Sequence, residues 1–324
     1  MEVTKLEYYP YTLTPKFAPN RLTEATPRSG ALLRVWFSDC SLPGHADLFP
    51  WPELGDMPLQ LQLETLKERI PLPLAASSLL WAHHEAKAHA SGEEFFPGTS
   101  LPSHLTALDR AAIPHGTPLV KLKVTEEDVQ NWPQVEALME RFPETRWRLD
   151  FNGLFTDMDR AYDSWNKLSH EAQDKIDFIE DPMDEKHMAH EDIHQVFPGA
   201  TIAVDRNPYP ASLRRAEVWV IKPVNFAPDV FLREAMDFEG KIVITSSMDH
   251  PLGQLMALRA AQLLQRRSPR KVLAGGLCTQ DLYLDHPQKN WVRTDNSCLR
   301  AALTDGAGWG LSHALGKLKW QELA

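Results

Sequence analysis

The sequence predicts an α/β protein whose main part is a parallel barrel, and three observations lead to this fold class. The chain has 324 residues, enough for about two domains, although a single barrel can reach this size. Hydrophobic residues make up 43% and charged residues 24%, as in ordinary folded proteins, so disordered and fibrous classes are excluded. Between Pro118 and Gly276, short β-branched segments alternate with amphipathic ones, as expected for parallel strands joined by helices.

The first 113 residues lack this alternation and predict a separate N-terminal region. Its expected elements are strands at 7–13 and 31–37, a turn-rich stretch at 38–56, and helices at 59–70 and 75–90. Glycine, proline and serine between 91 and 117 predict a connector.

Seven strands are expected in the alternating region, and an uninterrupted series of this length predicts closure into a barrel. The strands cover 119–124, 147–151, 177–180, 202–205, 218–222, 242–246 and 272–274. The pattern places no eighth strand. The last 40 or so residues lose the alternation, and we expect them to fold back onto the N-terminal region.

Two helices of the barrel are marked by spacing and capping. Thr125 to Asp128 resembles a capping box, and Trp132, Val135 and Leu138 then follow one helical face, with Pro133 near a first turn. A second helix is expected after the sixth strand, with its apolar face at Leu252, Leu255, Met256, Ala260 and Leu263.

Charge and apolar patterning exclude several classes of protein. The net charge is −10 and no basic stripe is present, which argues against nucleic-acid binding. No apolar stretch approaches the ~18–20 residues of a membrane span. The start has no apolar signal region, and the widely spaced Cys40, Cys278 and Cys298 fit a reducing compartment. We therefore expect a cytoplasmic protein with neither nucleic acid nor membrane as a partner.

Ionisable side chains stand at the predicted carboxyl ends of successive strands, where α/β barrels place their chemistry. The residues, in strand order, are Lys121 and Lys123, Asp150 with Asn152 beyond it, Glu180, Asp205 and Lys222, and the sixth strand ends in Ser246 and Ser247. Charged groups in a buried sheet are costly unless they are paired or bind a metal. Their order along the chain therefore predicts one site.

The predicted site divides into metal ligands and amines. Asp150, Glu180 and Asp205 form an all-oxygen set that suits Mg²⁺, whereas zinc would require histidine or cysteine. Lys123 and Lys222, on the first and fifth strands, are expected to face each other across the metal. This arrangement favours removal of a proton α to a carboxylate, because a divalent cation and ammonium groups stabilise the resulting enediolate.

Five ordered motifs carry a family resemblance. They are Val120-Lys121-Leu122-Lys123, Leu149-Asp150-Phe151-Asn152, Phe178-Ile179-Glu180-Asp181-Pro182, Ala203-Val204-Asp205 and Val220-Ile221-Lys222-Pro223, with 27, 30, 25 and 17 residues between key positions. The chain resembles the enolase superfamily, in its muconate-lactonising-enzyme-like branch. Within that branch it is similar to the o-succinylbenzoate synthase family, because of its shortness, the form of Arg148–Asn152 and the segment 44–56.

The resemblance implies a (β/α)7β barrel with an α+β capping domain formed from both terminal segments. The expected division is 1–113 for the N-terminal capping domain, 114–284 for the barrel and 285–324 for the segment that completes them. The implied reaction is a Mg²⁺-dependent syn dehydration, by a carbon–oxygen lyase, of the dianionic small molecule 2-succinyl-6-hydroxy-2,4-cyclohexadiene-1-carboxylate to o-succinylbenzoate, in menaquinone biosynthesis. Mn²⁺ is an expected substitute for Mg²⁺.

The resemblance also implies residue roles. Lys123 takes the α-proton and then helps hydroxide to leave, Lys222 stabilises the enediolate, and the three acidic residues hold the metal. The expected substrate-binding residues are Lys121, Arg148, Asn152, Ser246, Ser247 and Gly276.

Two other functions stay open at this stage. The first is an N-acylamino acid racemase or dipeptide epimerase of the same superfamily, and the second is a non-catalytic barrel that binds a ligand. Arg206 follows Asp205 where the family commonly has a second acid, which favours a one-base dehydration over racemisation. His187, His190 and His194 share a helical face, but charged neighbours favour a solvated surface over a metal site. Trp51 could close over the barrel mouth or simply pack against it.

Overall fold

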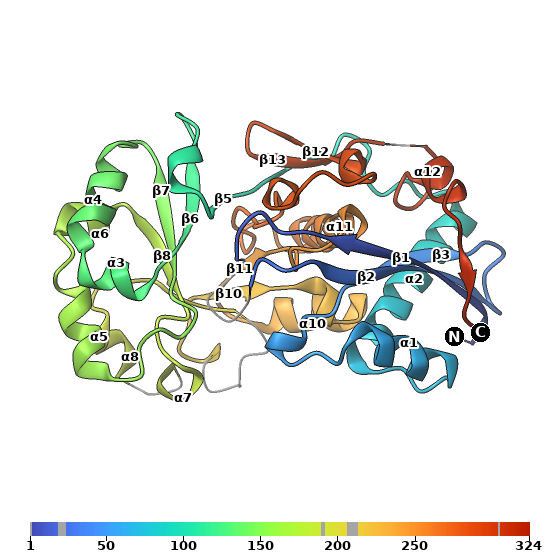
Figure 1. Cartoon of the computed structure of the whole chain (residues 1–324), viewed down its shortest axis with the longest axis horizontal. Helices are drawn as coiled ribbons and strands as arrows, with labels where there is room; N and C mark the ends of the chain where they lie inside the picture. Colours follow the sequence, from blue (N-terminus) through green and yellow to red (C-terminus); the bar gives the residue numbers. More distant parts are fainter. Residues whose placement is uncertain (1, 19–23, 189–191, 206–212, 304) are drawn as a thin grey trace.

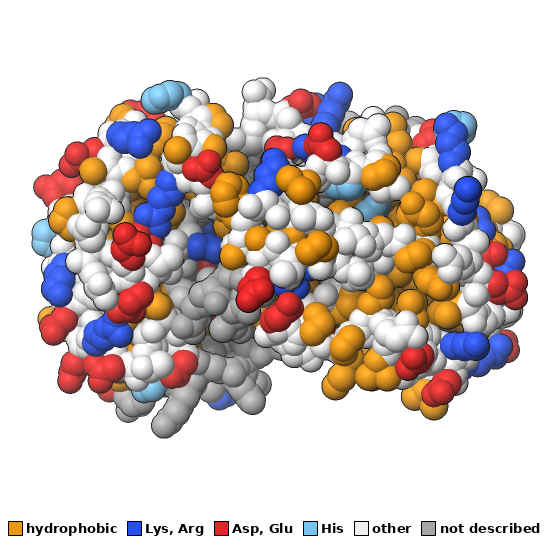
Figure 2. All heavy atoms as spheres, viewed as in Figure 1, with side chains coloured by type: hydrophobic (Ala, Val, Ile, Leu, Met, Phe, Trp, Pro, Cys, Tyr) orange, Lys and Arg blue, Asp and Glu red, His pale blue; other side chains and the backbone are white. Residues whose placement is uncertain are grey.

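A computed structural model describes residues 2–18, 24–188, 192–205, 213–303 and 305–324 (Figure 1). Within these ranges the strands form a four-stranded, a seven-stranded and a three-stranded sheet. The described chain contains no helix with both the length and the apolar character needed to span a membrane. In the view of Figure 2, acidic and basic side chains intermingle around the barrel, while hydrophobic side chains gather over the other end of the molecule.

The four-stranded sheet combines both ends of the chain, and with its two helices we call it the capping domain. Its strands, in sheet order, are β14 (Gln321–Glu322), β1 (Val3–Leu13), β2 (Arg28–Phe37) and β3 (Gly44–Leu48). Helices α1 (Leu59–Lys67) and α2 (Pro73–Ser91) follow, and the C-terminal Ala324 accepts a hydrogen bond from the main chain of Leu6 at 2.7 Å. The expected strands and helices are present, and the chain end returns to β1.

Strand β3 is a correction, because the sequence predicted turns there. All five of its residues are buried, so β3 has no polar face and none of the alternation that marks a half-exposed strand. Gly44 at its start lies against the backbone of Ala82 in α2, which leaves no room for a side chain.

The seven-stranded sheet is parallel throughout and forms most of the barrel. Its strands, in sheet order, are β5 (Leu105–Ala107), β6 (Leu119–Lys123), β7 (Arg146–Asp150), β8 (Ile176–Glu180), β9 (Ile202–Val204), β10 (Val218–Ile221) and β11 (Lys241–Ile244). Six of these strands were predicted. The seventh, β5, lies in the stretch that was expected to be a connector, so that expectation was wrong.

The last predicted strand, 272–274, is not a continuous strand, but its segment closes the barrel. On one side Leu273 and Gly276 donate main-chain hydrogen bonds to Ile242 and Ile244 of β11. On the other side His104 donates to the main chain of Gly275 at 2.7 Å. The segment from Val272 to Gly276 thus bridges β11 and the start of β5, which completes an eight-membered ring.

The remaining elements lie around the barrel and, in the case of α12, beside the capping domain (Figure 1). They are α3 (Glu126–Gln130), α4 (Trp132–Glu140), α5 (Met158–Trp165), α6 (His170–Asp174), α7 (Glu185–Met188), α8 (Ile193–Val196), α10 (Pro228–Asp237), α11 (Pro251–Arg267) and α12 (Ser312–Gly316), with the small sheet of β4 (Leu101–Pro102), β12 (Val292–Asp295) and β13 (Cys298–Ala301). Short 3₁₀ helices cover Pro52–Leu54, Arg110–Ala112, Pro223–Asn225, Gln280–Leu282 and Lys289–Trp291.

The capping box predicted at Thr125 is present. The Thr125 hydroxyl accepts from the main chain of Asp128, whose carboxylate accepts from the main chain of Thr125. The capping box begins α3, whereas the predicted helical face lies in α4, because Asn131 leaves the helical region between them with φ −138° and ψ 56°. Pro133 then lies in the first turn of α4.

The barrel interior follows the two-residue alternation of its strands. A small apolar cluster fills the interior with side chains of Phe178, Ala203, Val218, Val220 and Val243. Their alternate neighbours, such as Ile179 and Trp219, belong to the larger core beneath the helices. Each inward residue at a strand end, such as Glu180 above Phe178, therefore stands one layer above this apolar floor.

Candidate active site

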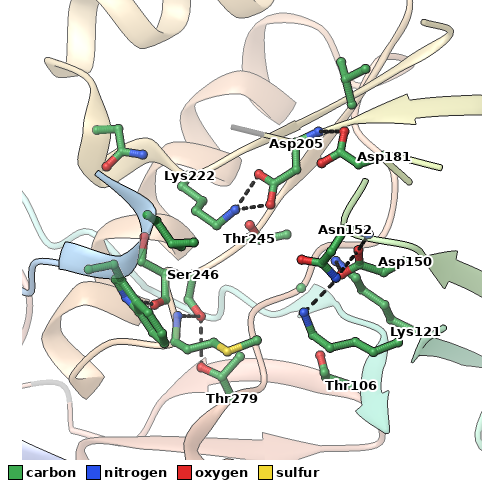
Figure 3. Close-up of a pocket in the computed structure, with 18 of the residues that line it drawn as sticks. Thr106, Lys121, Asp150, Asn152, Asp181, Asp205, Lys222, Thr245, Ser246 and Thr279 are labelled. Atoms are coloured by element: carbon green, nitrogen blue, oxygen red, sulfur yellow. Dashed lines mark hydrogen bonds and ion pairs between the residues drawn. The ribbon is translucent and has the colours of Figure 1, made fainter. Parts of the chain in front are cut away.

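Strand-end side chains converge on a cavity of about 520 Å³ between the barrel mouth and the capping domain (Figure 3). The predicted residues that line it are Lys121, Lys123, Asp150, Asn152, Asp205, Lys222, Ser246, Ser247 and Gly276. They come from β6, β7 and the segments that follow β9, β10, β11 and residue 275. The alternation of the strands therefore brings nine of the eleven predicted residues to one space.

The two lysines of β6 reach the first carboxylates. Lys121 Nζ lies 2.7 Å from Glu180 Oε1 and 2.9 Å from Asp150 Oδ2, and Lys123 Nζ lies 3.2 Å from the same Asp150 oxygen. The other Asp150 oxygen accepts from the side chain and main chain of Asn152 at 2.7 and 3.1 Å. Burial opposes the charge of both partners, but Asp150 and Glu180 raise the pKa of Lys121, and Lys121 and Lys123 lower that of Asp150.

Lys222 forms an ion pair with both carboxylate oxygens of Asp205, and the main chain of Asp205 donates to Asp181 Oδ1 at 3.1 Å. Figure 3 shows this pair on a different side of the pocket from Asp150 and Asn152. The cavity thus has an ammonium group from β6 and another from the end of β10, with carboxylates between them.

Glu180, Asp181 and Asp205 each place a carboxylate oxygen within 4.8 Å of the other two. Burial, together with the charges of Asp150 and Asp205, raises the pKa of Glu180 to about 7 despite the opposing effect of Lys121. Burial and the neighbouring carboxylates, Asp205 first, also raise the pKa of Asp181 well above its usual range. Burial and mutual repulsion thus oppose the ionisation of Glu180 and Asp181 beside Asp205, and a bound divalent cation would neutralise their charge.

Glu180 provides the test of whether a metal fits this group. Its side chain is 1% exposed, and among the described residues its Oε2 has no hydrogen-bond partner while Oε1 binds Lys121. A buried carboxylate oxygen without a donor is costly unless a cation occupies the space beside it. Carboxylate oxygens are also the donors that Mg²⁺ prefers. The residues present therefore fit a hard divalent cation.

Comparison with known proteins identifies the family. A model of the o-succinylbenzoate synthase N-terminal domain matches residues 6–88. The o-succinylbenzoate synthase of Bdellovibrio bacteriovorus is 30% identical over 344 residues, which cover 98% of each chain. The chain belongs to the o-succinylbenzoate synthase family. It is therefore an enzyme of the carbon–oxygen lyase class, within the enolase superfamily, as the motifs indicated.

Solved structures confirm the predicted α/β barrel with its capping domain. The o-succinylbenzoate synthase of Thermosynechococcus elongatus, which has Mg in its active site, matches 87% of this chain and 95% of its own at a TM-score of 0.64 and 18% identity. The L-Ala-D/L-Glu epimerase of Bacillus subtilis matches 96% of this chain and 98% of its own, with a TM-score of 0.77 and 15% sequence identity. At these identities the matches show the shared fold alone.

In this member of the o-succinylbenzoate synthase family, Asp181 is a candidate ligand that the sequence did not single out. Strand alternation would turn the side chain after Glu180 outward. Asp181 has φ 42°, however, so it leaves the strand in a left-handed conformation and its carboxylate joins that of Asp205. Asp150 lies outside the closest group of three and connects to it through Lys121, so its role as a ligand stays a prediction.

Arg148 and Glu180 are the two predicted residues that do not line the cavity. Arg148 is two residues before Asp150 and therefore lies one layer lower, with its guanidinium 4.6 Å from the ring of Phe178. It is 1% exposed and donates to Asp177 at 2.8 Å and to the main chain of Ala274 at 2.7 Å. The structure therefore gives Arg148 no direct path to a substrate.

Several polar residues of the cavity were not predicted from the sequence: His104, Thr106, Thr245 and Thr279. Thr279 lies 2.9 Å from the hydroxyl of Ser246, although 33 residues separate them. Trp51 lines the cavity and is 6% exposed, so it packs at the mouth, and closure of its loop stays a prediction. No motif marks these residues, because their proximity depends on how the barrel closes.

His187 and His194 do not line the cavity. His187 pairs with Asp184 at 2.8 Å, and His194 contacts the main chain of Arg215 at 2.9 Å, so they have separate partners. His190 and Arg206 lie outside the described residues. The domain boundaries at 113 and 284 stay predictions, although β5 of the barrel sheet precedes the first of them.

Proposed function

We propose that this chain catalyses the Mg²⁺-dependent syn dehydration of 2-succinyl-6-hydroxy-2,4-cyclohexadiene-1-carboxylate to o-succinylbenzoate, a step of menaquinone biosynthesis. The observation that supports this most is the pair of lysine side chains, Lys123 and Lys222, which line one cavity and contact the buried carboxylates between them. Family membership supports the same reaction, since the Bdellovibrio relative bears the name of this enzyme.

Asp150, Glu180 and Asp205 would hold the metal, and Asp181 adds a fourth carboxylate beside them. The unpartnered Oε2 of Glu180 and the clustering of these acids support the assignment. When bound, Mg²⁺ would neutralise the negative charge that develops on the substrate carboxylate. Mn²⁺ prefers the same oxygen donors, and we propose it as a substitute.

Lys123 is the proposed base. Its amine lies 3.2 Å from Asp150, which orients it at the cavity wall. A neutral amine would take the proton from the carbon next to the ring carboxylate and so leave an enediolate. The resulting ammonium would then return that proton to the departing hydroxyl oxygen as the carbon–oxygen bond breaks. The products are water and an aromatic ring, and Lys123 ends the reaction in the protonation state in which it began.

Lys222 is the proposed electrostatic stabiliser of the enediolate. Its ion pair with Asp205 holds the Lys222 side chain on the side of the cavity away from Asp150. A fixed ammonium group stabilises charge that appears only in the transition state. Lys121, Asn152, Ser246, Ser247 and Gly276 line the rest of the cavity and are proposed to contact the non-reacting parts of the dianionic substrate.

The proposal is tested by an ultraviolet assay for o-succinylbenzoate formation from the cyclohexadiene substrate. Mg²⁺-dependent formation of the aromatic product is expected. In a parallel reaction, N-acylamino acids and dipeptides are incubated with the enzyme in D₂O. Deuterium at an amino-acid α-carbon together with no aromatic product would instead assign the chain to the racemases or epimerases of the superfamily. Neither reaction at millimolar substrate would indicate a binding protein.

A further inference from the structure

His104 lines the cavity, but none of the roles proposed above involves it. It lies just before β5, is 3% exposed, and is held by the hydrogen bond from its main chain to Gly275 that closes the barrel. Its inward direction follows the same alternation as Thr106, which also lines the cavity. Its ring therefore lies at the floor of the site.

The partner of His104 determines which ring nitrogen carries the proton. Arg148 Nη1 lies 2.9 Å from His104 Nδ1. A guanidinium group donates hydrogen bonds and cannot accept them, so Nδ1 must be the acceptor and must be unprotonated. The single proton of the neutral ring is therefore on Nε2.

Arg148 cannot easily turn away from this contact. Its Nε donates to Asp177 at 2.8 Å, and the same Nη1 that faces His104 also donates to the main chain of Ala274 at 2.7 Å. Burial first, and then the positive charges of Arg148 and Lys121, lower the pKa of His104 well below its usual range. Both the geometry and the electrostatics thus favour the neutral ring.

The ring edge that carries Nε2 lies beside Gly276. A methyl group at this glycine would come within 2.8 Å of both Cε1 and Nε2 of His104. Gly276 itself lines the cavity, so the absence of a side chain there leaves the Nε2 edge uncovered. A hydrogen-bond donor is therefore available at the floor of the site.

We propose that His104 is a substrate-binding residue that donates a hydrogen bond from Nε2 to a carbonyl or carboxylate oxygen of the substrate. Arg148 is then a positioning residue, which acts by keeping the proton on that nitrogen. The inference rests on the proposed function for the identity of the substrate. It also gives Arg148 an indirect role in place of the direct contact that the sequence predicted.

Three substitutions at position 104 separate the donor from the shape of the ring. Gln places an amide nitrogen near the position of Nε2, Asn places one nearer Nδ1, and Leu has no donor. For His104→Leu we expect KM and the dissociation constant of o-succinylbenzoate to rise about 10- to 100-fold, the loss typical of a hydrogen bond to a charged group. His104→Gln should restore most of the affinity, and His104→Asn should restore little.

His84 offers a matched control. Like His104, it accepts a hydrogen bond from an arginine, Arg259, at 3.3 Å, but it is only partly buried and lies on α2, outside the cavity lining. His84→Leu should lower the melting temperature without a change in KM. If His104→Leu behaves like His84→Leu, with product affinity within about 2-fold of wild type, the inference is overturned.

Nuclear magnetic resonance can determine the tautomer of His104 in the wild-type protein itself. In ¹⁵N-histidine-labelled wild-type protein, the signals of His104 are assigned by their loss in His104→Gln. We expect the Nε2-protonated neutral form, and we expect Arg148→Met to allow the other tautomer while Arg148→Lys retains the original one. An Nδ1-protonated or doubly protonated ring in wild type would overturn the inference. Failure of the proposed function is distinguishable, because wild type itself would then neither bind nor form o-succinylbenzoate.

Discussion

The indole nitrogen of Trp51 donates a hydrogen bond to the main-chain oxygen of Ser247 at 2.9 Å. This bond joins the loop after β3 of the capping domain to the loop after β11 of the barrel, across 196 positions of sequence. The ring is covered by the guanidinium of Arg28 at 4.1 Å, and Arg28 is held by a two-bond ion pair with Glu53. The cavity wall is thus built from both domains.

Trp51→Phe keeps an aromatic ring beneath Arg28 but removes the donor to Ser247. One lost hydrogen bond of about 1 kcal/mol predicts that kcat/KM falls about 2- to 10-fold, mainly through KM. Steady-state kinetics measure the change. Trp36→Phe is the control, since Trp36 of β2 lies beneath Lys5 and Arg34 and does not line the cavity. Equal kinetics for Trp51→Phe and wild type would show that the bond does not shape the site.

Lys123→Ala removes the proposed base. General acid–base catalysis contributes about 10²- to 10⁴-fold, so we expect turnover to fall by about that factor while circular dichroism and metal binding stay unchanged. Lys167→Ala, at an exposed position, serves as the control. Near-normal product formation by Lys123→Ala would exclude this lysine as the base.

Removal of the metal should stop the reaction reversibly. With excess chelator we expect no product formation, and added Mg²⁺ should restore activity and raise the melting temperature, because the ion binds the folded state. Glu180→Gln, which alters the buried carboxylate with the unpartnered oxygen, should weaken this thermal response. Glu171→Gln on exposed α6 should leave it intact. Full activity in excess chelator would contradict the proposed mechanism.

Two buried carboxyl groups predict a loss of stability as the pH rises. Asp47 of β3 and Asp249 of the barrel both approach Gly253, since a methyl group there would lie within 2.6 Å of a carboxylate oxygen of each. Burial raises the pKa of Asp249 to about 7, and burial together with the charge of Asp249 raises the pKa of Asp47 well above its usual range. The folded state therefore binds protons that the unfolded state, with a carboxyl pKa near ~4, has already lost.

Between about pH 4 and about pH 7, stability should accordingly fall by up to about 1.4 kcal/mol per pH unit for each such group. Urea unfolding of wild type and Asp249→Asn across this range measures the difference, and the substitution should flatten the slope. Asp237→Asn, at an exposed position, is the control. Parallel slopes for wild type and Asp249→Asn would refute the assignment.

Gly44→Ala should be strongly destabilising. The added methyl group would lie 1.8 Å from the main-chain oxygen of Ala82, so α2 and β3 would have to separate. Overpacking against backbone predicts a loss of about 3 kcal/mol or more in the free energy of unfolding. At Gly316, where the same methyl meets no atom within 4 Å, a change within about 0.5 kcal/mol is expected. Comparable unfolding curves for the two variants would contradict this packing.

The regular part of the barrel could be predicted because its local signals agree. Residues that end strands, such as Pro182 after Glu180–Asp181 and Pro223 after Lys222, mark where each strand ends, and period-two alternation then determines which side chains point inward. Strands β3 and β5, which are among those not predicted, lack these signals. Strand β3 is buried on both faces, and β5 has only three residues within a stretch rich in proline, glycine and serine.

The site was predicted where it follows from strand order, and missed where it depends on one backbone angle or on a distant contact. Arg148 belongs to the same motif as Asp150. It precedes Asp150 by two residues, however, so its side chain lies one layer deeper in the barrel, below the cavity. Asp181 enters the acidic group only because its φ of 42° reverses the expected direction. His104 and Gly276 meet across the barrel closure, which no local pattern describes.

The closure of the barrel by Val272–Gly276 also protects the sheet against aggregation between copies of this chain. An open parallel sheet ends in strands with unpaired main-chain groups, which can add a strand from a second molecule and so start aggregation. Here, within the part of the chain that the structure describes, the inner edges of β11 and of the chain leading into β5 both find partners in this one segment. A substitution that weakened the pairing of this segment, such as Leu273→Pro, would leave both strand edges unpaired. We expect its first measurable effect to be lower solubility.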